Sequence, residues 1–218
     1  MGKIISVPYI DQTERYPTGC ESISSVMLLH YLGEEITPEK FIDVFLYKRD
    51  FEFHDGYLYG PHPDDAFIGS PYNDEKGSYG CYAPCIAAAL NRAAGERFQF
   101  TAQKGRTIAW LLEQGIDRDL PVVFWATLNM EPSSPGVIWR MLGRNGEFQW
   151  INHQHTLLLV GYDEKYYYFN DPWMNTGCRY WLQQSHTGAS PESERRVPGA
   201  HWKVLSTSTL KPNRIPWS

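Results

Sequence analysis

Cys20 is the residue whose surroundings best suit chemistry. It follows Pro17-Thr18-Gly19 and opens an apolar pattern that predicts a helix from about Cys20 to Leu32. A thiol at a helix N-terminus faces unpaired backbone N–H groups and the positive end of the helix dipole, and both favour the thiolate. We therefore expect a nucleophilic cysteine with a lowered pKa. A buried cysteine that simply begins a helix is the alternative, and position alone does not separate the two.

A nucleophilic cysteine needs a base, and His155 is the best placed of seven histidines. It begins a run, His155 to Tyr162, that predicts a strand, so its ring would lie at the edge of a sheet. His153 would share that face if the strand extends backwards, and it is the rival candidate. The remaining histidines are expected to pack inside a helix or to lie in surface loops: His30, His54, His62, His186 and His201.

The base needs a group that orients it, and Asp171 is the expected orienter. The runs 155–162 and 166–169 flank the short turn 163–165 and so predict a hairpin. With three residues in the turn, Asp171 falls on the face of His155; with four, Asn170 replaces it, because a one-residue slip reverses every side chain. A carboxylate stabilises imidazolium more strongly than an amide. Taken alone, Asn170-Asp171-Pro172 is more typical of a simple turn than of a catalytic segment.

Gln12 is the candidate for the oxyanion hole. Acyl chemistry requires hydrogen-bond donors aimed at the developing oxyanion. The backbone N–H of Cys20 could provide one donor, and a side-chain amide just upstream could provide the other. Gln12 lies eight residues before Cys20, in the segment that leads into the helix.

The elements that must position these residues form a helical first half and a strand-rich second half. This order predicts an α+β fold in a single domain covering residues 1–218. Two long stretches, about 50–80 and 129–146, are expected to be loops. The first is acidic and aromatic, which suits either a wall of a substrate cleft or a solvated loop pinned by a few rings. Helices are expected at 20–32, from 37 onward, at 83–94 and at 107–114; strands are expected at 4–9, 97–103, 120–128, 148–151, 155–162 and 166–169.

The composition excludes several classes of function. The chain has 42% hydrophobic and 21% charged residues and a formal net charge of −5, with no Lys/Arg stripe for nucleic acid and no apolar run that could span a bilayer. Cys81 and Cys85 lack the second pair of ligands that a zinc site needs, so no metal site is expected. The acyl chemistry of Cys20 and His155 needs no metal or organic cofactor. A disulfide from either residue to Cys178 stays open. A secretory leader is not apparent, so the protein is expected to be cytoplasmic, or secreted with its leader absent.

Four segments together resemble the papain-like cysteine peptidases that process bacteriocins and cut double-glycine leaders, and most closely their stand-alone branch. They are Val7 to Gln12, Gly19 to Ser22, His155 to Asp163, and Asn170 to Pro172. Gly80 to Pro84 also looks like that branch. The resemblance implies a papain-like fold with Gln12, Cys20, His155 and Asp171 in the catalytic positions.

The resemblance is a better guide to the class of reaction than to the substrate. A Walker A loop and a membrane domain are both missing from this sequence, so a transporter-coupled leader peptidase is not expected. The partner is expected to be a peptide or acyl substrate. Acyl or peptidyl transfer by the same residues, or a catalytically idle peptide-binding module, remain alternatives.

Overall fold

The computed structural model describes residues 2–74, 77–175, 177–182 and 207–212. The main helices are α1 (Cys20–Tyr31), α2 (Pro38–Lys40), which continues into a π-helical turn η1 (Phe41–Phe45), α3 (Ala83–Ala94) and α4 (Ile108–Gln114). The strands are β1 (Lys3–Ile4), β2 (Lys48–Arg49), β3 (Glu52–His54), β4 (Tyr57–Gly60), β5 (Phe67–Ile68), β6 (Phe98–Gln103), β7 (Val122–Thr127), β8 (Pro135–Met141), β9 (Glu147–Ile151), β10 (Gln154–Tyr162), β11 (Tyr166–Asp171), β12 (Gly177–Leu182) and β13 (Thr207–Pro212). Single 3₁₀ turns, η2 (Ile116–Arg118), η3 (Leu128–Met130) and η4 (Trp173–Asn175), complete the described elements.

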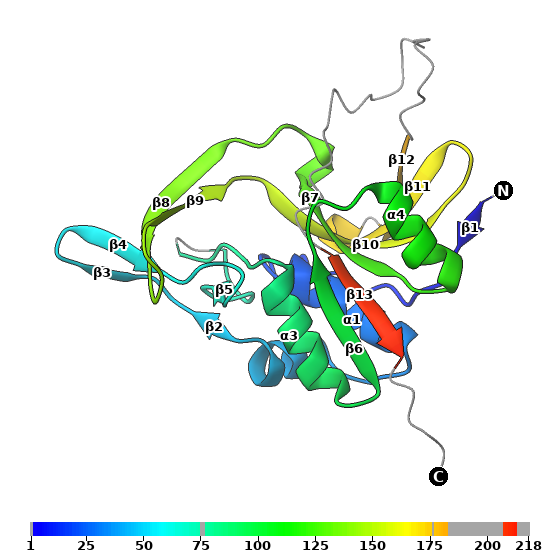
Figure 1. Cartoon of the computed structure of the whole chain (residues 1–218), viewed down its shortest axis with the longest axis horizontal. Helices are drawn as coiled ribbons and strands as arrows, with labels where there is room; N and C mark the ends of the chain where they lie inside the picture. Colours follow the sequence, from blue (N-terminus) through cyan, green and yellow to red (C-terminus); the bar gives the residue numbers. More distant parts are fainter. Residues whose placement is uncertain (1, 75–76, 176, 183–206, 213–218) are drawn as a thin grey trace.

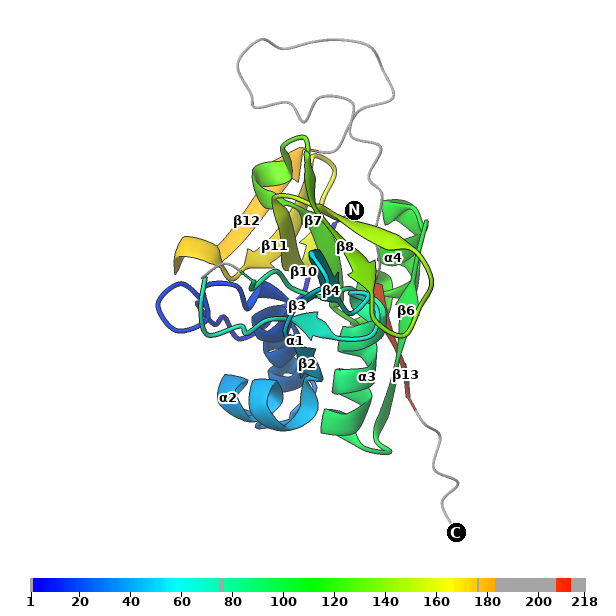
Figure 2. The same cartoon turned by 90° about the vertical axis from the view of Figure 1, so that its left-hand side faces the viewer.

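The main sheet has the order β12-β11-β10-β7-β13-β6, with β1 paired to β10, and these pairs are antiparallel. Helices α1 to α3 form one half of the molecule and strands β7 and β10 to β12 form the other, as Figure 2 shows. The predicted α+β class is therefore confirmed.

The sheet has two buried faces, and side chains alternate between them. In β10, Leu158 and Val160 pack with α1 and α3, whereas Leu157 and Leu159 pack in a second cluster that includes Leu111 of α4. Strand β7 alternates in the same way. This double burial explains why the run from Leu157 to Val160 is apolar throughout, since a strand covered on both faces has no solvent side.

The helices begin and end where their sequences indicate. Thr37 caps α2 by accepting a hydrogen bond from the Lys40 N–H at 3.2 Å, and Pro38 follows it as the first helical residue. Gly95 ends α3 with a positive φ of 60°. These signals come from local chemistry, so they can be read from the sequence without knowledge of the tertiary structure.

The two expected loops contribute three strands to a second sheet, so the expectation of loops is wrong for those residues. Strands β3 and β4 form a hairpin within 50–80, β8 lies within 129–146, and the four strands are ordered β3-β4-β8-β9. Strands β8 and β9 arch away from the main sheet to the projecting β3–β4 hairpin (Figure 1). We call this four-stranded sheet the arm. Strand β9 was expected at 148–151, whereas β3, β4 and β8 were missed. Strands β4 and β8 pair in parallel, a contact between distant segments that no local pattern encodes.

Aromatic rings fix the arm to the helical half. Trp139 is 1% exposed and its indole N–H donates to the Pro61 carbonyl at 3.0 Å. Phe51 contacts Trp139 edge-on with ring centroids 5.1 Å apart, and Tyr82 stacks on Trp150 at 5.8 Å. The rings of 50–80 therefore divide into two sets: those packed on the core, such as Phe51, and exposed ones, such as Phe53 at 75%.

The β10–β11 hairpin has a longer turn than expected. Tyr162 pairs with Tyr167, so four residues lie between the paired positions. A bulge between Leu159 and Gly161 then shifts the register by one residue, and Leu158 pairs with Asn170. The bulge cancels the slip that the longer turn would cause. Asp171 consequently shares a face with His155.

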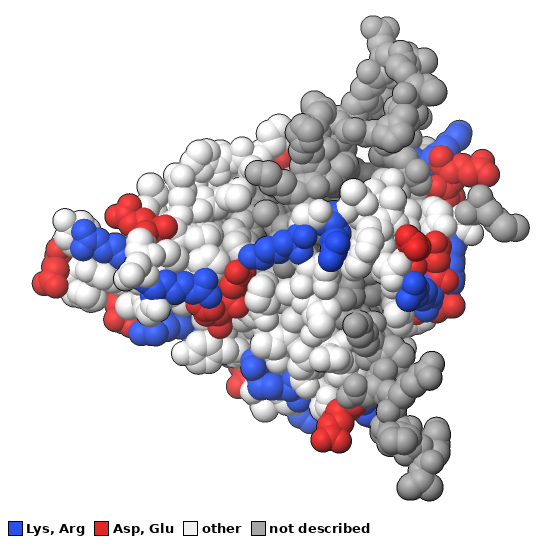
Figure 3. Space-filling model, viewed as in Figure 1, with Lys and Arg blue, Asp and Glu red and all other residues white. Residues whose placement is uncertain are grey.

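Charges of both signs are distributed over the surface. In Figure 3 the Lys/Arg and Asp/Glu side chains lie close to one another around wide uncharged areas. Lys104 and Asp64, for example, form an ion pair of 2.9 Å. Within the described residues, helices are too short or too polar to cross a membrane.

Candidate active site

Cys20 is the first residue of α1 and lies against β10. Gly19 precedes it as the N-cap, where an added Cβ would come within 2.8 Å of the Tyr16 Cβ, so the approach to the helix has no room for a larger residue. The Ser24 hydroxyl, one turn later, donates to the Thr156 carbonyl at 3.2 Å. Thr156 also hydrogen-bonds to the Cys20 sulfur through its backbone and its side chain. The nucleophile candidate therefore contacts the residue that directly follows His155.

The expectation of a lowered pKa at Cys20 is wrong. Burial, and secondarily the negative charge of Glu21, raise the pKa of the Cys20 thiol well above its ordinary value, against the hydrogen bonds from Thr156, which lower it. Removal of the sulfur from water destabilises the thiolate by more than the N-terminus of the helix stabilises it. At neutral pH the resting sulfur is therefore a thiol.

His155 and Asp171 form a buried pair. The His155 Nε2 lies 2.7 Å from Asp171 Oδ1, and the two residues are 5% and 1% exposed. Asp171 Oδ1 also accepts the Trp173 backbone N–H at 3.0 Å. A carboxylate at this nitrogen fixes the tautomer with the proton on Nε2, which leaves Nδ1 free to accept a proton.

His153 lacks these surroundings. It lies in the turn before β10 with a positive φ of 61° and is exposed, so the strand does not extend back to it. His30, inside α1, hydrogen-bonds to the Ile36 carbonyl at 2.9 Å and has a packing role, as expected.

The expected strand of residues 4–9 is wrong, because only Lys3–Ile4 pair in a sheet. Residues 5–12 instead run past residues 170–172 as an extended segment, which we call the strap. The Tyr9 hydroxyl donates to the Asp171 carbonyl at 2.9 Å, and the Gln12 N–H donates to the Pro172 carbonyl at 2.9 Å. The Asn170 side chain donates to the Val7 carbonyl at 3.3 Å. Three bonds thus join the strap to residues 170–172, the segment that carries the Asp171 carboxylate.

The Gln12 side chain is 2% exposed and its donors are engaged. Nε2 donates to the carbonyls of Tyr16 and Pro17, both at 3.2 Å, while Oε1 is buried without a hydrogen-bond partner. Both bonds are at the long end of the normal range. Turning the amide over would set Oε1 against two carbonyl oxygens, so the present orientation is the favourable one. For Gln12 to act as an oxyanion donor, one of its two Nε2–H groups must also hydrogen-bond to the oxyanion, in addition to or in place of its present carbonyl partner.

Glu21 is a residue that the sequence reasoning did not assign to the site. It is 4% exposed, and its Oε2 lies 3.3 Å from the Cys20 sulfur. Oε1 accepts the Cys81 backbone N–H at 2.9 Å. An acidic residue in the first turn of a helix is commonly explained by the helix dipole. Its position directly after Cys20, the expected nucleophile, was the signal that could have found it.

The sequence matches the Peptidase_C39-like family over residues 4–190, most of the chain. The chain belongs to this family. Uncharacterized protein YvpB of Bacillus subtilis (strain 168) is 28% identical over 159 residues, which cover 73% of this chain and 60% of YvpB. The C39-like chain thus spans less than two thirds of that relative's length.

Two crystal structures share the fold. One is a Bacillus anthracis protein assigned as a C39-like peptidase, with a TM-score of 0.69, 23% identity and coverage of 96% of this chain and 98% of that one. The other is a double-glycine motif protease from an AMS/PCAT transporter in complex with its leader peptide, with a TM-score of 0.51, 16% identity and coverage of 96% and 94%. The resemblance to stand-alone C39-like peptidases and the papain-like fold are thereby confirmed.

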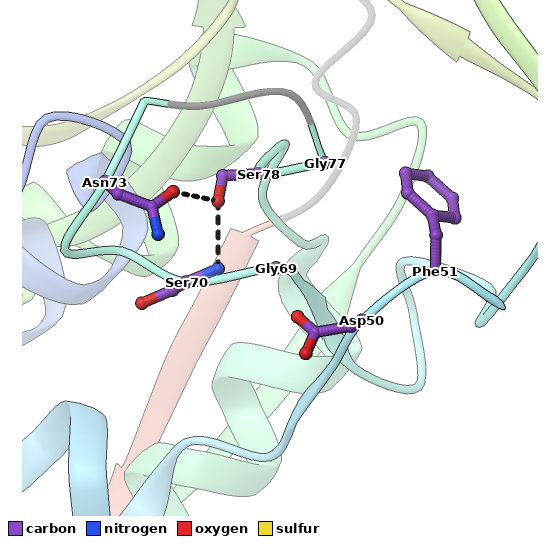
Figure 4. Close-up of a pocket in the computed structure, with 7 residues that line it drawn as sticks. All are labelled: Asp50, Phe51, Gly69, Ser70, Asn73, Gly77 and Ser78. Carbon is purple, nitrogen blue, oxygen red and sulfur yellow. Dashed lines mark hydrogen bonds between the residues drawn. The ribbon is translucent and has the colours of Figure 1, made fainter.

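A small polar hollow lies beside the segment that leads to Cys20 in this C39-like protein. It has a volume of about 210 Å³, and its walls include Asp50, Ser70, Asn73 and Ser78. The Ser78 hydroxyl donates to Asn73 at 2.6 Å and accepts the Ser70 N–H, with Asp50 facing them across the hollow (Figure 4). Thr18 Oγ1 lies 2.9 Å from the carbonyls of both Ser70 and Asn73. The acidic stretch 50–80 therefore contacts the chain two residues before Cys20.

The other cysteines supply no metal site in the described part of the C39-like chain. Cys81 and Cys85 are free and buried, and burial raises the pKa of Cys81 well above its ordinary value. The described residues contain no cluster of three or more His, Cys, Asp or Glu that could hold a metal ion. The side chain of Cys178, and with it the possible disulfide, lies outside the described residues.

Proposed function

We propose that the chain is a cysteine peptidase that cleaves peptide or amide bonds, with Cys20 as nucleophile, His155 as base, Asp171 as orienter and Gln12 in the oxyanion hole. The observation that carries the proposal is the buried 2.7 Å pair of His155 and Asp171 beside Thr156, which hydrogen-bonds to the Cys20 sulfur. Burying two ionisable groups is costly unless they are paired, and such pairs are concentrated at functional sites.

In the first half of the proposed reaction, His155 Nδ1 takes the thiol proton of Cys20, and the sulfur forms a bond to the substrate carbonyl carbon. The carbonyl π electrons move onto oxygen, which the Cys20 N–H and Gln12 Nε2 stabilise. The oxyanion then collapses, the C–N bond breaks, and the imidazolium gives its proton to the departing amine. A thioester to Cys20 remains.

In the second half, water replaces the amine. His155 removes a proton from water as the water oxygen attacks the thioester, and it returns that proton to the sulfur when the C–S bond breaks. Asp171 stays ionised throughout and stabilises the imidazolium in both halves. The net reaction adds one water across one amide bond, and the protein returns to its starting protonation.

A peptide is the favoured substrate class. The double-glycine motif protease that shares this fold was crystallised with a leader peptide, and the hollow beside Thr18 could hold one substrate side chain. Asp50 in that hollow favours a basic or hydrogen-bonding side chain.

The test is a peptide library digested with the full chain, read by mass spectrometry, with a thiol-reactive activity probe in parallel. Cys20→Ala is expected to lower cleavage by about 10⁴-fold or more and to abolish probe labelling, because the nucleophile is lost. Cys85→Ala, a buried cysteine on α3, is the matched control and should keep both signals. Cleavage that survives in Cys20→Ala would refute the cysteine mechanism, and products joined to an added amine would identify a transferase.

A further inference from the structure

Glu21 has a fixed place beside the nucleophile that the mechanism above does not use. Its Oε1 accepts the Cys81 N–H at 2.9 Å, and this oxygen lies so close to Gly80 that a Cβ there would approach it to 2.4 Å. Gly80 has a φ of 134°, a conformation that favours glycine. The backbone of residues 80–81 thus holds one carboxyl oxygen and leaves Oε2 for the Cys20 sulfur at 3.3 Å.

The surroundings of Glu21 contain thiols and no compensating cation. The ionisable groups that interact with it are Cys20 on its own helix and Cys81 on the segment before α3, with Cys85 beside Cys81. His155 lies on β10, the strand that α1 packs against. In the described part of the chain, Glu21 has no ion-pair partner. Burial raises the pKa of Glu21 to about 7, although the bonds from the Cys81 amide and the Cys20 thiol lower it.

We propose that Glu21 is a further catalytic residue, a carboxyl that exchanges a hydrogen bond with the Cys20 sulfur and thereby sets the pH range of the nucleophile. As an acid, its Oε2–H donates to the thiolate and stabilises it. As a carboxylate, Oε2 accepts the S–H, and its charge opposes loss of the thiol proton. This role rests on the proposed function, because it concerns the same sulfur.

The two forms differ by one proton. In the acid form Glu21 is protonated, and its Oε2–H can donate to the sulfur when His155 takes the thiol proton. In the basic form Glu21 is ionised, and its charge opposes the loss of that proton from the resting thiol. Hydrogen bonds to a charged partner are roughly twice as strong as neutral ones, and a nearby like charge raises a thiol pKa. Reactivity of Cys20 should therefore fall as the pH rises through about 7, the pKa of Glu21, before direct ionisation of the thiol restores it at high pH.

Glu21→Gln separates the two effects. The amide keeps an oxygen for the Cys81 N–H and presents an N–H donor to the sulfur, but it cannot ionise. The matched control is Glu113→Gln on α4, an exposed carboxylate, which changes the net charge equally. The readout is the second-order rate of Cys20 alkylation by iodoacetamide from pH 5 to 8.5, with the labelled residue mapped by mass spectrometry. Iodoacetamide is small and neutral, so this rate does not depend on peptide turnover.

We expect the rate for the wild type and for Glu113→Gln to fall about fivefold or more between pH 6 and 8, and the rate for Glu21→Gln to show no such fall. At pH 8 the Glu21→Gln rate should exceed that of the wild type by about tenfold, one pKa unit of interaction. Superimposable profiles would overturn the proposal, as would absence of Cys20 labelling below pH 7. A fall in the labelling rate without any peptide cleavage would sustain this inference while refuting the peptidase proposal.

A second measurement applies if Glu21→Gln fails to fold. Isotope-edited infrared spectroscopy of glutamate-labelled wild type detects the loss of a buried carboxylic acid as the pH rises. That loss should occur at the same pH as the fall in alkylation rate, and alkylation of Cys20 should shift it. Loss of the acid band at a different pH from the change in reactivity would assign Glu21 a structural role only.

Discussion

Glu21 should also make the folded state lose stability as the pH rises towards neutral. Its pKa is raised from 4.5 to about 7 in the folded protein, so between these values the folded state holds a proton that the unfolded state has released. Stability that depends on this proton is complete below about pH 4.5 and is lost as the pH passes through 7. A difference of about 2.5 units at 1.36 kcal/mol each gives roughly 3 kcal/mol.

The measurement is denaturant unfolding of wild type and Glu21→Gln at pH 5 and at pH 8. Other carboxylates titrate in both proteins, so the quantity of interest is the difference between the two unfolding free energies at each pH. We expect Glu21→Gln to gain roughly 3 kcal/mol relative to wild type between pH 5 and 8, because only the wild type must ionise a buried acid. Glu113→Gln should gain nothing. An unchanged difference across this range would mean that the folded protein leaves the Glu21 pKa near its ordinary value, and the reasoning would fail.

The remaining predictions concern the residues around the reaction. Gln12→Ala should lower kcat by about 10²-fold to 10³-fold with little change in KM, whereas an effect confined to KM would make Gln12 a ground-state binding residue. His155→Ala should abolish turnover and His153→Ala should not, since only His155 is buried against a carboxylate; the reverse outcome in steady-state assays would disprove the assignment. Replacing the tip of the stretch 50–80 by a Gly-Ser bridge should slow cleavage of a long peptide and spare a small activated ester, and equal loss on both with the fold intact would show that the stretch supports the catalytic residues instead.

The sequence predicts the elements near the site well, because their signals are local. Helix α1 begins at Cys20 as expected, and α3 has the expected bounds of 83–94. The strand at His155 is recognisable from its β-branched and apolar run. These features depend on caps, periodicity and turn residues, which the chain carries within a few positions of each element.

Features that depend on distant contacts could not be predicted. The prediction that Asp171 shares a face with His155 assumed a three-residue turn. In the structure the turn has four residues, and a bulge near Val160 restores the predicted face. Gly161 is a glycine inside a strand, which is compatible with a bulge, but it does not fix the register on either side. The pKa of Cys20 was assigned the wrong direction because burial and the position of the Glu21 carboxyl are tertiary properties.

The hydrogen bonds of the Gln12 side-chain amide are a further feature that the sequence could not predict. The sequence predicts which residue type lies upstream of the nucleophile, but the orientation of its amide depends on the path of the backbone from Tyr16 to Pro17. Residue type and spacing therefore identify the members of a site more readily than they identify the free donors within it.

The parallel pairing of β4 with β8 has a consequence for how the chain folds. Tyr59 lies opposite Arg140, a separation of 81 residues, so the arm cannot close until both distant segments are present. Closure of so long a loop is entropically costly and is expected late, after the local contacts of α1 and α3.

The β3–β4 hairpin has an exposed first strand and few buried rings of its own, which places it at the low-stability end of the molecule. In native-state hydrogen exchange, amides of residues 52–60 should open well before those of β7 and β10, so the β3–β4 hairpin should detach while β8, β9 and the sheet beside Cys20 remain intact.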